Sequence, residues 1–426
     1  MKEDIRTILL RAFAAEDYAT VQAILKDHPE RLNPTCQRPP VTAVRTVAMA
    51  EQILALGADP KRAGEWWGPG FGTQEVDPAV AEFLVEKGAP LSVHAAAGLG
   101  LIGHLSALLD GDPTLVHAPG GDGCTPLHFA RNPETARWLL ERGAKIDARD
   151  EDHNSTPAQW LIRSAPEVSR LLVERGAQVD IFLAVALRDR QRVESLVAAN
   201  PGCVGWRIGK GPGFPSLGFH GRGGTIYQWT LGFHLYPHQI AWRDHDLELF
   251  QFLYQKSEVA TCFLVDCVLA RRPEAEALLG ENPDMVAGLS EEDLRLPALY
   301  CWETNTNFDA VKLMLDLGFP VAHPERSHGY TPLHNAAWQG AADLVDLLIS
   351  RGHPIAIRDP GYNSTPLGYA IHDCFVEKRH PEVDFLPVFR SLLAAGSPWN
   401  PKFLKEIEVE PEVKTLFDQY RHQAQD

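Results

Sequence analysis

A short motif, Thr-Pro-Leu-His, recurs along this chain of 426 residues and constrains its fold more than any other feature. Complete copies begin at Thr125 and Thr331, and shorter forms that keep Thr-Pro begin at Thr156 and Thr365. Neighbouring copies are 31 or 34 residues apart in the sequence. A regular period of this length indicates a protein built by stacking one small supersecondary unit many times.

Each residue of the motif has a physical role in a pair of short helices. Thr can cap a helix by accepting a hydrogen bond from an unpaired N–H, and Pro at the first helical position has no N–H to leave unpaired. We expect the His to form local hydrogen bonds and to tie neighbouring repeats. The apolar positions of both helices, such as Leu333, Ala336 and Leu347, should be buried between repeats. Gly143 and Gly176 suit the left-handed position after a second helix.

The motif and the Gly-Ala turn that follows it resemble the signature of the ankyrin repeat. Weaker copies occur at 8–14, 39–43, 91–100, 180–186, 236–241, 262–268 and 296–302. The resemblance implies an all-α solenoid of about ten helix-turn-helix repeats, several of them degenerate, with a finger insert. The segments expected are N-terminal repeats (1–201), a Gly- and aromatic-rich insert (202–235), C-terminal repeats (236–400) and a charged cap or tail (401–426). The pattern is also similar to that of long bacterial ankyrin-only proteins, which supply no activity to transfer.

Two irregular segments fall where an ankyrin finger would project toward a concave groove. The longer one, within 202–235, is rich in Gly and aromatic residues, and loops of this length inside a repeat array are typically functional. Its Gly209-Lys210 pair lacks the Gly and Ser/Thr neighbours of a phosphate loop. The second finger spans 62–72. We predict that both contribute contacts to a ligand or partner: Trp206, His220, Arg222, Tyr227 and Trp229 from the first, Trp66 and Trp67 from the second.

Laying the template on the later repeats places further side chains in the groove, because the two positions after the Ala pair face it. The candidates for partner binding are Arg243, Trp338 and Gln339, and the candidates for acid–base chemistry are Asp244, Glu303, His372 and Asp373. Acids, a His and a Trp in one groove would suit a polar-ligand pocket or a general acid–base site. Polar residues at such positions would equally serve as a solvated surface.

Composition excludes several classes of function. The formal charge of −16 and the absence of a basic cluster argue against nucleic acid as a partner. Seven scattered cysteines without a CxxC pair favour a reducing compartment, and we find neither a signal peptide nor a membrane span, so we expect a cytoplasmic protein. His234 and His238 have helical spacing, but Pro237 lies between them, so we do not expect them to share a helix face as metal ligands. No metal, dinucleotide or nucleophile motif is present, so we expect no cofactor.

Two functional hypotheses follow. The first is a non-catalytic recognition scaffold that holds a protein partner with its concave groove and aromatic fingers. The alternative is an enzyme, or a binder of a sugar-like or other polar small molecule, with an acid–base site in the groove beside the 202–235 insert. No motif in the sequence names a reaction.

Overall fold

The computed structural model describes residues 5–34, 39–67, 70–209, 225–302, 306–325, 329–402 and 409–424. Within these ranges the secondary structure is helical and contains no β-strand, while an isolated bridge joins Trp399 and Ala424. The all-α prediction is therefore confirmed. The chain divides into two compact units: unit 1 comprises Met1–Arg192 and His220–Leu231, and unit 2 comprises Val193–Phe219 and Gly232–Asp426.

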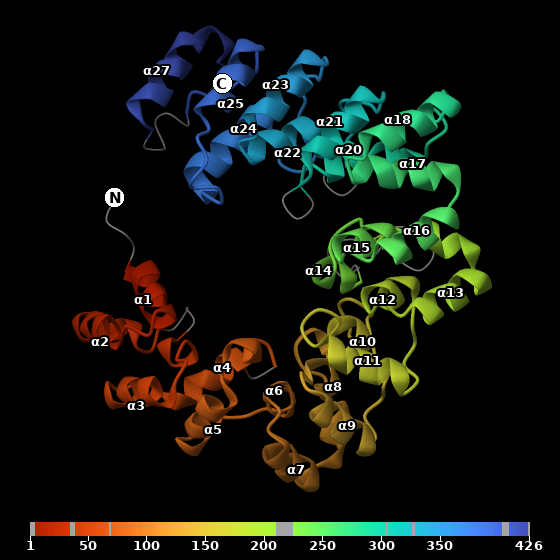
Figure 1. Ribbon diagram of the computed structural model, residues 1–426. Coiled ribbons are helices and arrows are strands. Elements are labelled where there is room, and N and C mark those ends of the chain that lie inside the picture. Colours follow the sequence, from red (N-terminus) through yellow and green to blue (C-terminus); the bar gives the residue numbers. More distant parts are fainter. Residues whose placement is uncertain are drawn as a thin grey trace. The chain divides into compact units, whose positions relative to one another are not determined.

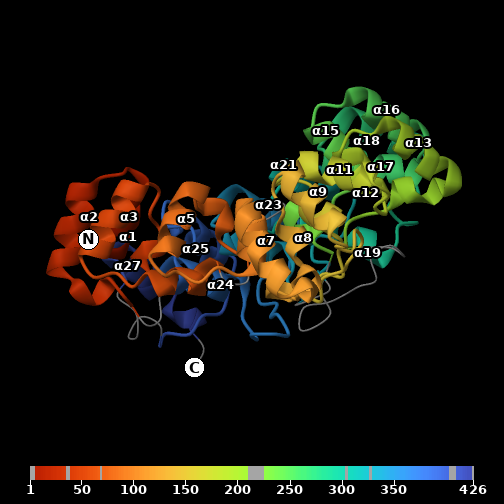
Figure 2. The ribbon, with the colours of Figure 1, turned by 90° about the horizontal axis from the view of Figure 1, so that it is seen from below.

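Unit 1 is a succession of short antiparallel helix pairs (Figure 1). The pairs α1–α2, α6–α7, α8–α9 and α10–α11 pack within themselves, and α6, α8 and α10 stack on one another. Helices α1, α2, α3 and α5 lie next to one another in both views (Figures 1 and 2). The helices are α1 (Ile5–Ala14), α2 (Tyr18–Asp27), α3 (Val47–Ala55), α4 (Ala63–Trp67), α5 (Pro78–Glu86), α6 (Val93–Leu99), α7 (Ile102–Gly111), α8 (Pro126–Phe129), α9 (Pro133–Glu141), α10 (Pro157–Trp160), α11 (Pro166–Glu174), α12 (Ile181–Ala186) and α14 (Tyr227–Thr230).

Unit 2 repeats the same arrangement after α13 (Arg190–Ala199), which crosses the boundary between the units. Its inner helices α20, α22 and α24 pack in succession, as do its outer helices α21, α23, α25 and α27 (Figure 1). The helices are α15 (Pro237–Arg243), α16 (Leu247–Gln255), α17 (Val259–Val268), α18 (Arg272–Glu281), α19 (Glu291–Leu294), α20 (Leu296–Leu299), α21 (Phe308–Asp316), α22 (Pro332–Trp338), α23 (Ala342–Ser350), α24 (Pro366–His372), α25 (Leu386–Ala394) and α27 (Pro411–Gln419).

The Thr-Pro copies open inner helices as their sequence predicts. Thr125, Thr156, Thr331 and Thr365 are the N-cap residues of α8, α10, α22 and α24, each with Pro at the start of the helix. In α8, α10 and α22 a capping box also joins the cap residue to the side chain three positions later. These helices of four to seven residues are therefore stabilised at their N-termini by their own motif.

The His of the motif ties one repeat to the next. His334 is fully buried, its Nδ1 accepts from the Thr331 backbone N–H at 3.3 Å, and its Nε2 lies 3.2 Å from the carbonyl oxygen of Ser364. Ser364 directly precedes the Thr that caps the following inner helix. His128 makes the equivalent contact with the Ser155 carbonyl, also at 3.2 Å. Burial lowers the pKa of both imidazoles, which keeps them in the neutral form that these hydrogen bonds need.

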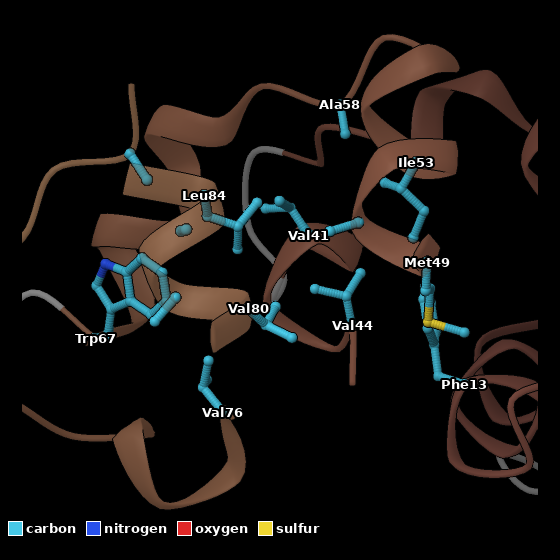
Figure 3. Packing of buried hydrophobic residues seen from close by; sticks show 14 of the residues in the cluster. Phe13, Val41, Val44, Met49, Ile53, Ala58, Trp67, Val76, Val80 and Leu84 are labelled. Atoms are coloured by element: carbon cyan, nitrogen blue, oxygen red, sulfur yellow. The ribbon is translucent and has the colours of Figure 1, made fainter. Parts of the chain in front are cut away.

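The core of the first helices in unit 1 contains one of the predicted binding residues. Trp67 is only 1% exposed and lies beside Val80 and Leu84 (Figure 3). Its indole N–H donates to the Pro90 carbonyl oxygen at 2.9 Å, so both the ring and its polar atom are satisfied inside the unit. The assignment of Trp67 to a binding surface is therefore wrong. The side chain of Trp66 lies outside the described part of the chain.

One core prediction in unit 2 also needs correction. Leu333 and Ala336 are fully buried in α22 as expected, but Leu347 on α23 is only half-buried. The buried face of α23 is formed by Leu344 and its neighbours at helical spacing, Val345 and Leu348. Leu347 lies about 100° around the helix from Leu348, at the edge of that face.

Candidate functional site

The described ends of the long insert are anchored in the two units. In unit 1 the Ile226 backbone N–H donates to Ser155 Oγ at 3.0 Å. The Tyr227 hydroxyl donates to the Asp180 carboxylate, at 3.0 and 2.9 Å from its two oxygens. Gln159 Nε2 donates to the same carboxylate at 2.9 Å. Three segments of unit 1 thus meet at Asp180.

Tyr227 therefore has a structural role that its position in the insert did not indicate. Its side chain is completely buried, and burial raises the pKa of its hydroxyl well above the usual value. Burial also raises the pKa of Asp180, against the opposing effect of its hydrogen bonds. Since the ring is out of reach of any partner, the prediction that Tyr227 lines a binding surface is wrong.

The other predicted residues of the insert differ in exposure. Trp229 in unit 1 is 59% exposed, and Trp206 in unit 2 is half-buried at the end of the 3-10 turn Pro201–Gly205. His220 and Arg222 lie outside the described residues, as does Glu303.

Three of the predicted groove residues lie together at the C-terminal ends of inner helices in unit 2. Trp338, the last residue of α22, stacks on His372, the last residue of α24, with ring centres 5.9 Å apart and planes 30° apart. Gln339 follows Trp338 and accepts from Thr306 Oγ1 at 2.8 Å through its Oε1. Its Nε2 donates to the Cys301 carbonyl oxygen, which joins the end of α22 to the end of α20.

Aromatic residues that the template did not assign extend this cluster. Tyr369 contacts Trp338 with ring centres 5.8 Å apart and Tyr330 with ring centres 5.4 Å apart. Tyr330 in turn stacks on Trp302 at 5.9 Å. The guanidinium of Arg379 lies 5.7 Å from the Trp338 ring centre. We call these six residues, Trp302, Tyr330, Trp338, Tyr369, His372 and Arg379, the inner-helix row.

The row combines buried aromatic rings with polar side chains that are exposed to solvent. Trp338, Tyr330 and Tyr369 are each 7–8% exposed, whereas the side chains of His372 and Arg379 are 49% and 52% exposed. Rigid rings therefore lie beneath an imidazole and a guanidinium that reach solvent.

The candidate Asp373 does not face a groove. It is fully buried, at the start of a π-helical turn, Asp373–Glu377, that continues α24. Its carboxylate lies 2.8 Å from His380 Nδ1 and accepts from the Arg379 backbone N–H at 3.1 Å. Because the π turn directs Asp373 into the fold, the Asp373 carboxylate holds the 373–380 turn together. The prediction that Asp373 is available for acid–base chemistry is therefore wrong.

The structure does not assemble the other acid–base candidates into one site. His372 lies 3.5 Å from Glu377 at the surface of α24. Asp244 caps the C-terminus of α15 and lies 3.4 Å from the exposed side chain of Arg243, its neighbour in the sequence. Three helix pairs, α17–α18, α20–α21 and α22–α23, separate α15–α16 from α24 in the array. Since each repeat in such an array contacts only its neighbours, the side chains of Asp244 and His372 are not brought together.

Arg379 and Glu377 could have been found from the sequence by one signal. The segment between α24 and α25 is longer than the template allows and contains the charged run 377–380.

Within the described ranges, no group of three or more His, Cys, Asp and Glu side chains is placed to hold a metal ion. The same ranges contain no helix long and apolar enough to cross a membrane.

Two family models match parts of this architecture. Residues 122–151 match the family described as ankyrin repeat, and residues 314–370 match the family described as ankyrin repeats in many copies. The crystal structure of the human ASB11 ankyrin repeat domain is 19% identical in sequence, with 72% of this chain and 98% of that chain covered and a TM-score of 0.26. No curated protein matches the sequence.

The fold and the matches together define a helical repeat protein in which each pair of helices packs on the next. The chain contains ankyrin repeats at 122–151 and 314–370, as its sequence predicts. Ankyrin repeats are generally scaffolds for protein–protein interaction, and stacked repeats provide extended surfaces for such binding.

Proposed function

We propose that this protein is a recognition scaffold that binds a protein partner on the inner-helix row of unit 2. The observation that carries the proposal is the continuity of the row. Trp302, Trp338 and His372 come from three successive repeats, and direct ring contacts through Tyr330 and Tyr369 connect them.

The composition of the row supports binding of a protein. Trp, Tyr and Arg are the residues that most often dominate the free energy of protein interfaces. Rings held by their neighbours lose little conformational entropy when a partner is bound. Gln339, tied to α20 through the Cys301 carbonyl, and Thr306, which is exposed, add hydrogen-bonding groups beside the aromatic surface. Arg243 and the aromatic fingers Trp206 and Trp229 are proposed as further contacts, each within its own unit.

The enzyme alternative has no equivalent support. Of its candidate groups, Asp373 is hydrogen-bonded to His380, and Asp244 belongs to a distant repeat.

The proposed cellular location is the cytoplasm. Its support is that the cysteines of the described residues are free thiols, as at Cys124 and Cys267, which suits a reducing compartment.

Site-specific photocrosslinking tests the proposal. A benzoylphenylalanine residue replaces His372, or, as the matched control, Asp346 on the outer helix α23, which is also exposed. In a lysate of the source cells, we expect a protein crosslinked from position 372 and not from position 346. Binding of that protein should weaken at least tenfold in the Trp338→Ala variant, which corresponds to about 1.4 kcal/mol, and remain unchanged in Asp346→Ala. Equal crosslinking from both positions would contradict the proposal.

A further inference from the structure

Arg207 in unit 2 is a buried arginine that the proposed partner-binding surface does not use. It follows the 3-10 turn Pro201–Gly205, and its side chain is only 1% exposed. The next residue, Ile208, donates its backbone N–H to the Leu235 carbonyl oxygen at 2.9 Å, which holds this segment on the unit.

The hydrogen-bonding capacity of Arg207 is largely unused. A guanidinium carries five N–H donors and cannot lose its proton in a protein. Nη2 donates to the Glu292 carbonyl oxygen at 3.1 Å, whereas Nε and Nη1 are buried and have no hydrogen-bond partner among the described residues. An arginine buried in this state is costly, because its charge has left water and little replaces the lost hydration.

The nearest carboxylate does not resolve this imbalance. Asp293 Oδ1 lies 3.7 Å from Nη2, well beyond the 2.7–2.9 Å of a charge-assisted hydrogen bond. The other oxygen of Asp293 accepts from the Ser290 hydroxyl, so this carboxylate is held by its own helix N-terminus. Asp293 thus lies near enough to offset part of the charge of Arg207, but the Nε and Nη1 donors of Arg207 remain without an acceptor.

Two aromatic groups near Arg207 carry no charge that could balance it. The guanidinium lies 5.8 Å from the ring centre of Tyr236, whose pKa burial raises to about 12. Burial, and after it the charge of Arg207, lower the pKa of His234 to about 3, so this imidazole is neutral as well.

We propose that Arg207 is the centre of an internal oxyanion site that takes a phosphate or carboxylate group on its unused Nε and Nη1 donors. The site lies within unit 2 and is independent of the inner-helix row. Since both nitrogen atoms are buried, the anion exchanges only when the chain around Arg207 opens, so binding and release are slow compared with those at a surface site.

The test is thermal unfolding of the full chain after refolding in chloride buffer with increasing inorganic phosphate, or, in a second arm, acetate. A specific site raises Tm steeply at low anion concentration and then logarithmically, because the anion binds only the folded state. Phosphate also stabilises proteins without binding, by an effect that grows roughly in proportion to its concentration. Arg207→Met should keep only this proportional part, while Arg272→Met, which removes a surface arginine of the same unit, should behave as the wild type. A rise with phosphate alone assigns a phosphate group, and a rise in both arms assigns a carboxylate-sized oxyanion.

Two further results separate the site from an ordinary ion pair. Asp293→Asn removes the competing negative charge, so the logarithmic rise should begin at a phosphate concentration at least threefold lower. Without anion, the double variant Arg207→Met, Asp293→Asn should unfold at the same temperature as the wild type or higher, because it removes both buried charges together. If the wild type shows no logarithmic rise with either anion, the proposal is overturned, whether or not the Arg207 variant folds. A strong loss of stability in both Arg207→Met and Asp293→Asn, without an anion response, would instead show that the two residues form a structural pair.

Discussion

Replacing His334 with Ala should destabilise unit 2 by about 3 kcal/mol. The change removes two hydrogen bonds of a fully buried side chain, to the Thr331 backbone and to the Ser364 carbonyl, at about 1 kcal/mol each. It also removes an edge-to-face contact with Tyr369, at ring centres 5.3 Å apart, for which about 0.5–1.5 kcal/mol is typical. Because the His joins α22 to the cap of α24, its loss should uncouple neighbouring repeats.

The chain itself offers the matched control, because Gln159 holds the equivalent position in the Thr156 repeat. Gln159 Oε1 accepts from the Thr156 backbone N–H at 2.8 Å, so a Gln can preserve the capping contact. His334→Gln should therefore lose about 1 kcal/mol, roughly a third of the effect of Ala. Urea unfolding followed by circular dichroism gives the free energies, and native-state hydrogen exchange should place the loss of protection in α22–α25. Equal losses in the two variants, or a loss spread evenly over the chain, would refute the role of the His as a tie between repeats.

Three further predictions concern stability. Burial lowers the pKa of His353 from 6.5 to about 4, so between these pH values the unfolded chain binds a proton that the folded chain does not. The free energy of unfolding should therefore fall by about 3 kcal/mol from this residue as the pH drops from 7 to 4. Urea unfolding should show a continuous decrease in this free energy across that range, without a plateau. Leu348→Ala should cost about 2–5 kcal/mol and Leu347→Ala clearly less, and the reverse order in the same assay would contradict the assigned face of α23. Tyr227→Phe should cost about 1–3 kcal/mol, because the partly buried carboxylate of Asp180 loses a donor, and an unchanged Tm would show that the bond contributes nothing.

The features that could be predicted from the sequence are those set by local chemistry. A Thr-Pro pair caps a helix wherever it occurs, and the motif His finds its partner in the residue before the next Thr, because the period fixes that distance. The stacking of Trp338 on His372 is also accessible to this reasoning, since both residues end inner helices one repeat apart.

The direction of an aromatic side chain in a finger could not be predicted in the same way. Trp67 and Tyr227 both occur in Gly-rich, irregular stretches, yet each turns inward to a polar partner supplied by a distant segment, the Pro90 carbonyl and the Asp180 carboxylate. Asp373 differs for another reason. The template assumes that α24 ends after His372, whereas a π turn follows and carries the next carboxylate into the core.

Hydrogen–deuterium exchange of the complex with the crosslinked partner tests most directly whether this partner binds across the ends of α20, α22 and α24. Binding should slow exchange at the backbone amides around Trp302, Trp338–Gln339 and 372–380, while the outer helices α21 and α23 retain their rates. Protection confined to the outer helices, or to unit 1 alone, would contradict the claim.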